Sequence, residues 1–324
     1  LPFSLLERVW VELHPDPLKT TPAPVIILGH WRSGTTHLFN LLSRDPRFAW
    51  PGPVATGLPW DFLLLGRWLA PLLRRLLPRT RFIDNVAVNP DSPQEDEIAL
   101  ASMQELSYYH ALYFPEDFPG EFERGMFPET ASARLQNRRR RRFLHYCRKL
   151  LLQGGGETLL IKNPVYTGQV ADILALWPQA RFIHIHRNPY VVFESTRKFY
   201  QRLLPQYALQ DYTAEALDAC ILETYPRMLE RLYADIRGLP AGQFIELGYS
   251  ELEQAPLDTL RRIYRQLELG GFEAVESRFS TYLEGIRGYR RNPHVFEAAT
   301  LDRVEQHWGR YLQRWDYARP QASE

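Results

Sequence analysis

The segment Pro24–Leu42, PVIILGHWRSGTTHLFNLL, constrains the fold of this 324-residue chain more than any other feature. An apolar run, Val25–Leu28, leads into Gly29, and Gly34 follows just before a helical pattern. The spacing is that of the P-loop, in which backbone N–H groups and a helix N-terminus hold phosphate oxygens. It predicts a buried strand and then a phosphate-binding turn made of Arg32, Ser33, Gly34, Thr35 and Thr36.

The lysine of the P-loop pattern is missing, because Thr35 stands in its position. In triphosphate hydrolases that lysine spans the β- and γ-phosphates, so a γ-phosphate would lack its main cation here. Arg32 offers a forked guanidinium two residues before Gly34, which suits a phosphate or sulfate oxygen. The loop therefore predicts a nucleotide with a single phosphate at this end. The alternative interpretation is an ordinary strand–helix turn.

Three further apolar runs are each followed by a helical pattern, at Thr158–Lys162, Arg181–His186 and Gln243–Leu247. Repeated strand–helix units predict an α/β fold with a P-loop-like parallel sheet flanked by helices. Ligands of such sheets bind at the carboxyl ends of the strands. We therefore expect four side chains on one rim: Arg32, Lys162, Arg187 and Tyr249.

The chain is predicted to form a single domain over residues 1–324, with a core sheet from 20–45 and 156–270. The interval of about 50–150 shows no clear strand, and we interpret it as a helical insertion that caps the active-site edge. Residues 272–324 form a mixed C-terminal segment that contains GYRRNPH and HWGRYLQRWDY.

Composition excludes several classes of protein. The net charge of +1 gives no argument for a nucleic-acid partner. The two cysteines, Cys147 and Cys220, match no metal-ligand spacing or disulfide framework, which favours a reducing compartment. Leu58–Leu77 is apolar, but charged residues and Pro71 interrupt it, so it is not expected to span a membrane. We expect a cytoplasmic protein.

A second constellation, HIHRNPYVVFES, places Arg187 just after a predicted strand and Ser195 eight residues later. A loop arginine and a helix hydroxyl could converge on a second phosphate, separate from the first. The alternative is that Arg187 belongs to a simple turn and Ser195 to a helix face. His184 and His186 alternate with isoleucines, and we interpret both as core or rim histidines with satisfied hydrogen bonds.

At this point the sequence resembles the sulfotransferases that use 3′-phosphoadenosine 5′-phosphosulfate (PAPS). HWRSGTT is similar to the family's 5′-phosphosulfate loop, and Arg187 with Ser195 to its 3′-phosphate pair. GYSELEQAPLDTLRRIYRQLEL resembles a segment whose tyrosine lies near the adenine, which implies that role for Tyr249. GYRRNPH resembles the late basic loop that closes over the 3′-phosphate. This implies a cofactor-binding role for Arg290 and Arg291, and a cofactor-covering role for the C-terminal segment 272–324. The GTTHL, PQEDE, K-x-P-x-x-T-G and RNPY segments resemble the bacterial branch, and the resemblance covers residues 20–317.

The resemblance implies in-line attack of an acceptor oxygen, or nitrogen, on the sulfur, with adenosine 3′,5′-bisphosphate (PAP) leaving and no metal required. Negative charge builds on the bridging oxygen, so fixed cations there lower the barrier most. Lys162 is the first candidate for that cation, together with Arg32. A solvated lysine at the strand end is the alternative for Lys162.

The general base is where this sequence departs from the common pattern, because Tyr166 stands where many relatives have a histidine. A neutral tyrosine with a pKa of about 10 is a poor base at pH 7 but can donate a hydrogen bond. The acidic segment Glu95, Asp96 and Glu97 offers carboxylates, although it could equally be an acidic helix start. Our order of candidates is Glu95, Glu97 and then His37, with His110 further behind.

The acceptor is expected to be a small, hydrophobic molecule such as a lipid, polyketide, sterol or aryl alcohol. The apolar Leu58–Leu77 stretch could line an acceptor site or contact a membrane surface, while core packing is the commoner meaning of such a stretch. Arg138–Arg142 could be a solvated helix or a contact for anionic lipid. Two alternative functions are a P-loop kinase or NTPase, and a non-catalytic, membrane-associated nucleotide-binding protein. A homo-oligomer is compatible with the sequence.

Overall fold

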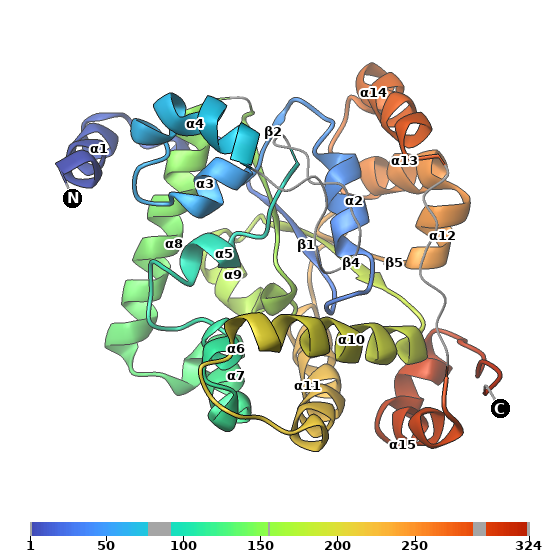
Figure 1. Cartoon of the computed structure of the whole chain (residues 1–324). Coiled ribbons are helices and arrows are strands. Elements are labelled where there is room, and N and C mark those ends of the chain that lie inside the picture. The colour runs from blue at the N-terminus through green and yellow to red at the C-terminus, as the bar shows by residue number, and fades with distance from the viewer. Residues whose placement is uncertain (1, 77–91, 155, 288–295, 323–324) are drawn as a thin grey trace.

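The computed structural model describes residues 2–76, 92–154, 156–287 and 296–322 (Figure 1). Its centre is a five-stranded sheet in the order β2-β3-β1-β4-β5, with all neighbouring strands parallel. The strands are β1 Val25–Leu28, β2 Phe48–Ala49, β3 Thr158–Lys162, β4 Arg181–His186 and β5 Phe244–Gly248. The predicted P-loop-like parallel sheet flanked by helices is confirmed.

The sheet contains one strand more than the sequence pattern predicted. β2 pairs with β3 at the edge of the sheet through two residues, Phe48 and Ala49. A strand of two residues is too short to show a period in the sequence. The prediction of four strands therefore missed β2, which lies just before the interval of about 50–150.

Each face of the sheet packs on its own set of helices. Val25 and Ile27 of β1 face α2 Thr35–Leu42, α12 Tyr249–Gln254, α13 Pro256–Gln266 and α14 Phe272–Gly285. Ile26 and Leu28 face the other cluster, to which α9 Val170–Leu176, α10 Pro189–Tyr207, α11 Ala214–Asp235 and α15 Ala298–Arg314 contribute. All four residues of β1 are fully buried, as expected for a central parallel strand.

All regular elements that the structure describes between β2 and β3 are helices, and turns connect them. Its helices are α3 Pro53–Gly57, α4 Leu65–Leu76, α5 Glu97–Leu100, α6 His110–Tyr113, α7 Phe118–Met126 and α8 Ala133–Gln153. Short 3₁₀ turns lie at Pro115–Asp117 and Pro128–Thr130. α8 begins at the N-cap Ser132, whose hydroxyl accepts from the Leu135 amide, and it runs the length of the insertion (Figure 1).

The arginine run on α8 is engaged with other parts of the protein. Arg138 pairs with Glu105, Arg140 lies 3.1 Å from Asp172, and Arg142 lies over the ring of Trp60. Arg139 also contacts Asp172, at 3.9 Å. These contacts match a helix whose arginine side chains reach around to its neighbours.

The described part of Leu58–Leu77, residues 58–76, does not form one continuous apolar stripe. Phe62 is buried in the core, whereas Trp68 and Leu72 of α4 are exposed. Among the described helices, none is long and apolar enough to cross a bilayer.

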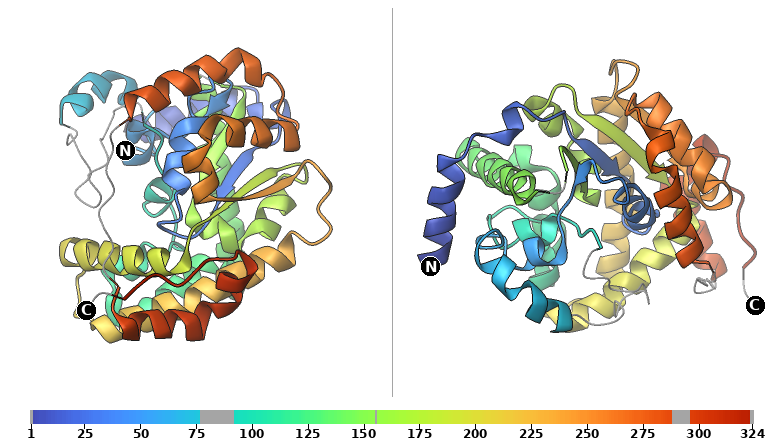
Figure 2. Two further views of the ribbon diagram at one scale, coloured as in Figure 1. Left: turned by 90° about the vertical axis from the view of Figure 1, so that its right-hand side faces the viewer. Right: turned by 90° about the horizontal axis from the view of Figure 1, so that it is seen from above.

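α1 Pro2–Leu13 is fastened to the insertion by a buried ion pair. Glu7 contacts the ammonium group of Lys149 on α8 at 2.5 Å, and both side chains are almost fully buried. The second carboxylate oxygen of Glu7 accepts from the backbone N–H of Leu64 at 2.8 Å. α1 accordingly lies beside α8 at the outer side of the insertion (Figure 2).

Glu7→Gln should destabilise the protein strongly, because it leaves the Lys149 charge buried without its counter-ion. Breaking a buried pair in this way costs roughly 3–5 kcal/mol. Glu12→Gln is the matched control, since Glu12 is exposed and lies 3.6 Å from Arg148, and it should cost less than about 1 kcal/mol. Urea denaturation measures both values, and equal losses would show that the Glu7–Lys149 pair is not what fastens α1.

Candidate active site

The glycine loop after β1 has a backbone that depends on its glycines. Gly29 and Gly34 have φ angles of 145° and 102°, where L-residues are strained. A Cβ at Gly34 would lie 2.1 Å from Cδ2 of Tyr249, and one at Gly29 would lie 2.5 Å from the carbonyl oxygen of Ile185. The Gly29 amide donates to the Thr167 hydroxyl at 2.8 Å. The loop is thus closely surrounded by the segments that follow β3, β4 and β5.

Arg32 also has a left-handed backbone, with φ of 70°. For a residue with a side chain this conformation costs roughly 1–3 kcal/mol, and it is concentrated at functional sites. The Arg32 Nε donates to the Ser195 hydroxyl at 2.9 Å. The conformation therefore aims the Arg32 side chain at α10.

Arg187 lies against the same loop. Its Nη1 donates to the carbonyl oxygen of Arg32 at 3.3 Å, and its guanidinium lies 4.9 Å from the centre of the Tyr249 ring. The His37 ring faces Tyr249 from α2, with ring centres 6.3 Å apart. The structure thus brings together the predicted residues Arg32, Arg187, Ser195 and Tyr249, which come from three segments distant in sequence.

The inner lining of the loop fits a bound anion. The Ser33 hydroxyl is buried and has no hydrogen-bond partner among the described residues. Thr35 is also buried and starts α2, whose N-terminus carries the positive end of the helix dipole. An orphaned hydroxyl beside a helix N-terminus is a suitable donor to an anionic oxygen.

Lys162 lies at the carboxyl end of β3, next to the loop. Its ammonium group donates to the Thr36 hydroxyl at 3.3 Å and forms an ion pair with Glu95. The Lys162 side chain is only 1% exposed, whereas Glu95 retains 18%. A lysine this deeply buried requires a counter-ion, and the insertion supplies it.

The three consecutive acidic residues face different surroundings. Glu95 is the one that reaches Lys162, while Asp96 and Glu97 are buried. Burial raises the pKa of Asp96 to about 7 and raises that of Glu97. Glu97 accepts hydrogen bonds from Ser107 at 2.5 Å and Asn163 at 2.9 Å, so both of its oxygens are occupied within the protein.

The remaining sequence-predicted candidates are Tyr166, His110, Arg290 and Arg291. Tyr166 is 1% exposed and donates to Asp96 from the 3₁₀ turn Pro164–Gly168. His110 starts α6 in the insertion. Arg290 and Arg291 lie outside the described residues. Among the described residues, no group of three His, Cys, Asp or Glu side chains could hold a metal ion.

A cluster of aromatic and polar side chains supports the segment that carries Arg187, and the sequence pattern did not indicate it. The His186 ring stacks on Trp315 with ring centres 4.3 Å apart. Its Nδ1 forms a hydrogen bond with the Tyr317 hydroxyl at 3.0 Å. Burial lowers the pKa of His186 to about 3.

His184 contacts Glu246 at 2.9 Å. Burial alone would raise the pKa of Glu246, but hydrogen bonds from His184 and Tyr233 lower it to about 2. The interpretation of both histidines as structural is consistent with these contacts.

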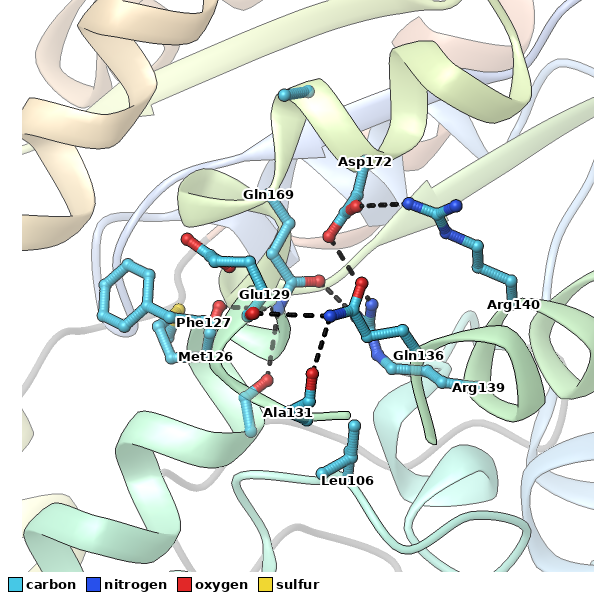
Figure 3. Close-up of polar contacts among 12 residues, drawn as sticks. Leu106, Met126, Phe127, Glu129, Ala131, Gln136, Arg139, Arg140, Gln169 and Asp172 are labelled. Carbon is cyan, nitrogen blue, oxygen red and sulfur yellow. Dashed lines mark hydrogen bonds and ion pairs between the residues drawn. The ribbon is translucent and has the colours of Figure 1, made fainter. Parts of the chain in front are cut away.

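Gln169 joins the insertion to the segment after β3, and it was also not predicted (Figure 3). Its side-chain amide donates to the carbonyls of Gly125 and Met126 at 3.1 and 2.7 Å. Its Oε1 accepts from Arg139, which also contacts Asp172. Because Gln169 follows the turn that carries Tyr166 and Thr167, this network holds the loop between Lys162 and α9 against the insertion.

Comparison with known proteins agrees with this geometry. A family model described as "Sulfotransferase family" matches residues 24–274, and the chain belongs to that family. It is 32% identical over 296 residues to omega-hydroxy-beta-dihydromenaquinone-9 sulfotransferase Stf3 of Mycobacterium bovis and of Mycobacterium tuberculosis, covering 91% of this chain and 76% of those proteins. The family favours a transferase over the kinase and the non-catalytic alternatives.

Two solved structures share the fold. Sulfotransferase STF9 from Mycobacterium avium has a TM-score of 0.70 at 18% identity, covering 96% of this chain and 81% of that one. Sulfotransferase STF1 from Mycobacterium tuberculosis has a TM-score of 0.66 at 20% identity, with coverage of 86% and 76%.

The buried carboxyl group of Asp96 should make stability depend on pH. An unfolded aspartate loses its proton near pH 3.8, whereas Asp96 keeps its proton to about pH 7. The free energy of unfolding should therefore fall as pH rises from about 4 to about 7, by up to about 4 kcal/mol. The side chain at this position cannot ionise in the Asp96→Asn variant, so this decrease should be absent there. The free energy of unfolding of the variant should therefore rise relative to that of the wild type between about pH 4 and about pH 7. Urea denaturation across a pH series measures the difference, and a difference independent of pH would contradict the assignment.

Proposed function

We propose that this protein transfers the sulfonate group of PAPS to a hydroxyl group of a hydrophobic, lipid-like acceptor. The observation that carries the proposal is the meeting of two anion-binding motifs at one rim. The lysine-free glycine loop holds Arg32 against Ser195 and Arg187 against the loop carbonyl. PAPS has one phosphate group at each end of its ribose to engage such a pair of motifs, and it has no γ-phosphate that would need a loop lysine.

The proposed nucleotide contacts follow from these positions. Residues Arg32–Thr36 would hold the 5′-phosphosulfate through backbone amides, the Ser33 hydroxyl and the start of α2. Arg187 and Ser195 would bind the 3′-phosphate through charge-assisted hydrogen bonds. Tyr249, which already packs on Gly34 and Arg187, would lie near the adenine. The roles predicted for Arg290 and Arg291 stay predictions.

The proposed chemistry uses the Lys162–Glu95 pair. The acceptor oxygen forms a bond to sulfur while the bond from sulfur to the bridging phosphate oxygen breaks, and PAP leaves. Lys162, with Arg32, would stabilise the charge that develops on the bridging oxygen. Glu95 would accept the proton of the acceptor hydroxyl, because among Glu95, Asp96 and Glu97 it is the one beside Lys162 and partly exposed. Glu97 and Tyr166 are occupied by buried partners, so His37, the third candidate in the sequence-based order, becomes the second.

The acceptor is proposed to be lipid-like for two reasons. The relatives named Stf3 are described as acting on an omega-hydroxy-dihydromenaquinone, a hydroxyl compound with a long apolar chain. This protein has a cleft of about 280 Å³ between β2, α3, α4 and α8, and its lining includes Trp50, Phe62 and Leu150. The Pro51 carbonyl next to Trp50 accepts from the Gln94 amide at 2.7 Å, so the cleft adjoins the segment that carries Glu95. We propose that this cleft takes the apolar part of the acceptor.

Membrane contact and self-association stay predictions. If the acceptor resides in a bilayer, the expected contact surface is the exposed apolar side of α1 and α4, which includes Leu5, Leu6, Leu13, Trp68 and Leu72.

Arg187→Ala should weaken the binding of PAP, because it removes a charge-assisted contact worth roughly 1.5–3 kcal/mol. Isothermal titration calorimetry should report an increase in Kd of roughly tenfold to a hundredfold. Arg278→Ala, at an exposed position on α14, is the control and should keep the wild-type Kd. An unchanged Kd for the Arg187 variant would remove the proposed 3′-phosphate site.

Lys162→Ala and Glu95→Gln should separate catalysis from nucleotide binding. We expect kcat with PAPS and a hydroxyl-bearing, long-chain acceptor to fall by about 10²–10³-fold for Lys162→Ala and by about 10²–10⁴-fold for Glu95→Gln. The affinity for PAP should change much less, and Lys19→Ala, at an exposed lysine, should behave as wild type. Equal losses in kcat and affinity would mean that Lys162 only binds the nucleotide, and no turnover of any hydroxyl acceptor by the wild type would overturn the proposed function.

A further inference from the structure

Each member of the acidic segment contacts a different residue of the chain that ends β3. Glu95 pairs with Lys162, Glu97 accepts from Asn163 at 2.9 Å, and Asp96 accepts from Tyr166. The two segments are far apart in sequence, yet three side-chain contacts join them. Lys162 also donates to Thr36 of the glycine loop, so we call Glu95–Lys162 the front contact. Asn163 and Tyr166 follow Lys162 in the sequence, and we call their contacts with Glu97 and Asp96 the rear contacts.

The Asp96–Tyr166 and Glu97–Asn163 contacts are buried on both sides, whereas the Glu95–Lys162 contact is buried only on the Lys162 side. Asp96, Asn163 and Tyr166 are at most 1% exposed, and Glu97 is 2% exposed. Only Glu95 retains access to solvent, with 18% of its side chain exposed. The rear contacts therefore cannot touch the acceptor without rearrangement of the core, whereas Glu95 can.

The rear contacts are also fixed in orientation. The Asn163 Oδ1 accepts from the Val165 amide at 3.0 Å, so its Nδ2 is the end that faces Glu97. The other Glu97 oxygen accepts from Ser107 at 2.5 Å. The Tyr166 ring packs against Phe143 with ring centres 5.6 Å apart, which leaves the hydroxyl directed at Asp96.

Two buried carboxyl groups are a costly way to fill a core. Apolar side chains of similar volume would be buried there with a smaller desolvation free energy. The best-attested role of buried polar pairs is to select one conformation or register of the chain over the alternatives. Here they would fix the register of the acidic segment against β3. A slip of one residue would bring Asp96, rather than Glu95, opposite Lys162.

We propose that the Asp96–Tyr166 and Glu97–Asn163 contacts form a two-point clamp that holds Glu95 against Lys162. Asp96, Glu97, Asn163 and Tyr166 are then positioning residues, since they act through Glu95 and Lys162 rather than on the substrate. The inference rests on the proposed function, in which Glu95 and Lys162 act on the acceptor and the leaving group. It also gives Tyr166 a role different from that of a base in the position of a histidine.

Tyr166→Phe tests the clamp, because it removes only the hydroxyl group. We expect kcat to fall about tenfold to a hundredfold, as small displacements of catalytic groups do, while the Kd for PAP stays at the wild-type value. Tyr146→Phe is the matched control. Tyr146 is fully buried near Asp96, and its hydroxyl has no hydrogen-bond partner among the described residues, so this variant should keep the wild-type kcat.

A double-mutant cycle distinguishes positioning from a general loss of structure. If Tyr166 acts through Glu95, adding Tyr166→Phe to Glu95→Gln should lower kcat by less than about twofold further. Asp96→Asn, which keeps an acceptor for the tyrosine hydroxyl, should also lose less activity than Asp96→Leu. Circular dichroism and full stoichiometry of PAP binding establish that each variant is folded.

The clamp and the proposed function fail in different ways. If the wild type turns over PAPS but Tyr166→Phe has the wild-type kcat, the clamp is wrong and the function stands. Independent losses in the cycle would also overturn the clamp, because Tyr166 would then act without Glu95. Absence of turnover by the wild type, with PAP still bound, would instead overturn the proposed function.

Discussion

The packing of the Tyr249 ring on Gly34 is the contact on which the rest of the rim depends. The ring occupies the space where any side chain at Gly34 would lie, with Cδ2 only 2.1 Å from the Cβ position. Arg187 lies over the same ring and bonds to the loop carbonyl. The ends of β1, β4 and β5 are therefore locked together by one aromatic ring. A residue proposed to lie near the adenine also shapes the glycine loop, so a substitution of Tyr249 would disturb both regions.

The missing loop lysine has a structural counterpart on the neighbouring strand. Lys162 reaches the Thr36 hydroxyl from the end of β3, so a cation adjoins the loop although none occupies the P-loop position. Because Lys162 is almost completely buried, its charge depends on Glu95. That carboxylate comes from the insertion between β2 and β3. The insertion therefore does more than cover the sheet, since it completes the charge balance of the site.

The sequence predicted the features that follow from periodicity and local spacing. The apolar runs of β1, β3, β4 and β5 and the rule that ligands lie at strand ends were sufficient to place Arg32, Lys162, Arg187 and Tyr249 on one rim. The two-residue strand β2 left no pattern to detect. The burial of Asp96 and Glu97 was also hidden, because it depends on partners such as Asn163 and Ser107 that only the tertiary fold brings near. The stacking of Trp315 on His186 is another contact of this kind.

The helical insertion has a polar attachment to the core in addition to its apolar packing. Gln169 bonds to two carbonyls of α7 and to Arg139 of α8 (Figure 3). The start of α5 is joined to the segment that follows β3 by buried carboxyl groups. Apolar contacts are non-directional, so they would tolerate small sliding of the insertion over the sheet. Hydrogen bonds at fixed positions do not tolerate it. A site that takes one charged group from the sheet and its partner from the insertion needs this second kind of attachment, because its geometry is only as accurate as the register between the two.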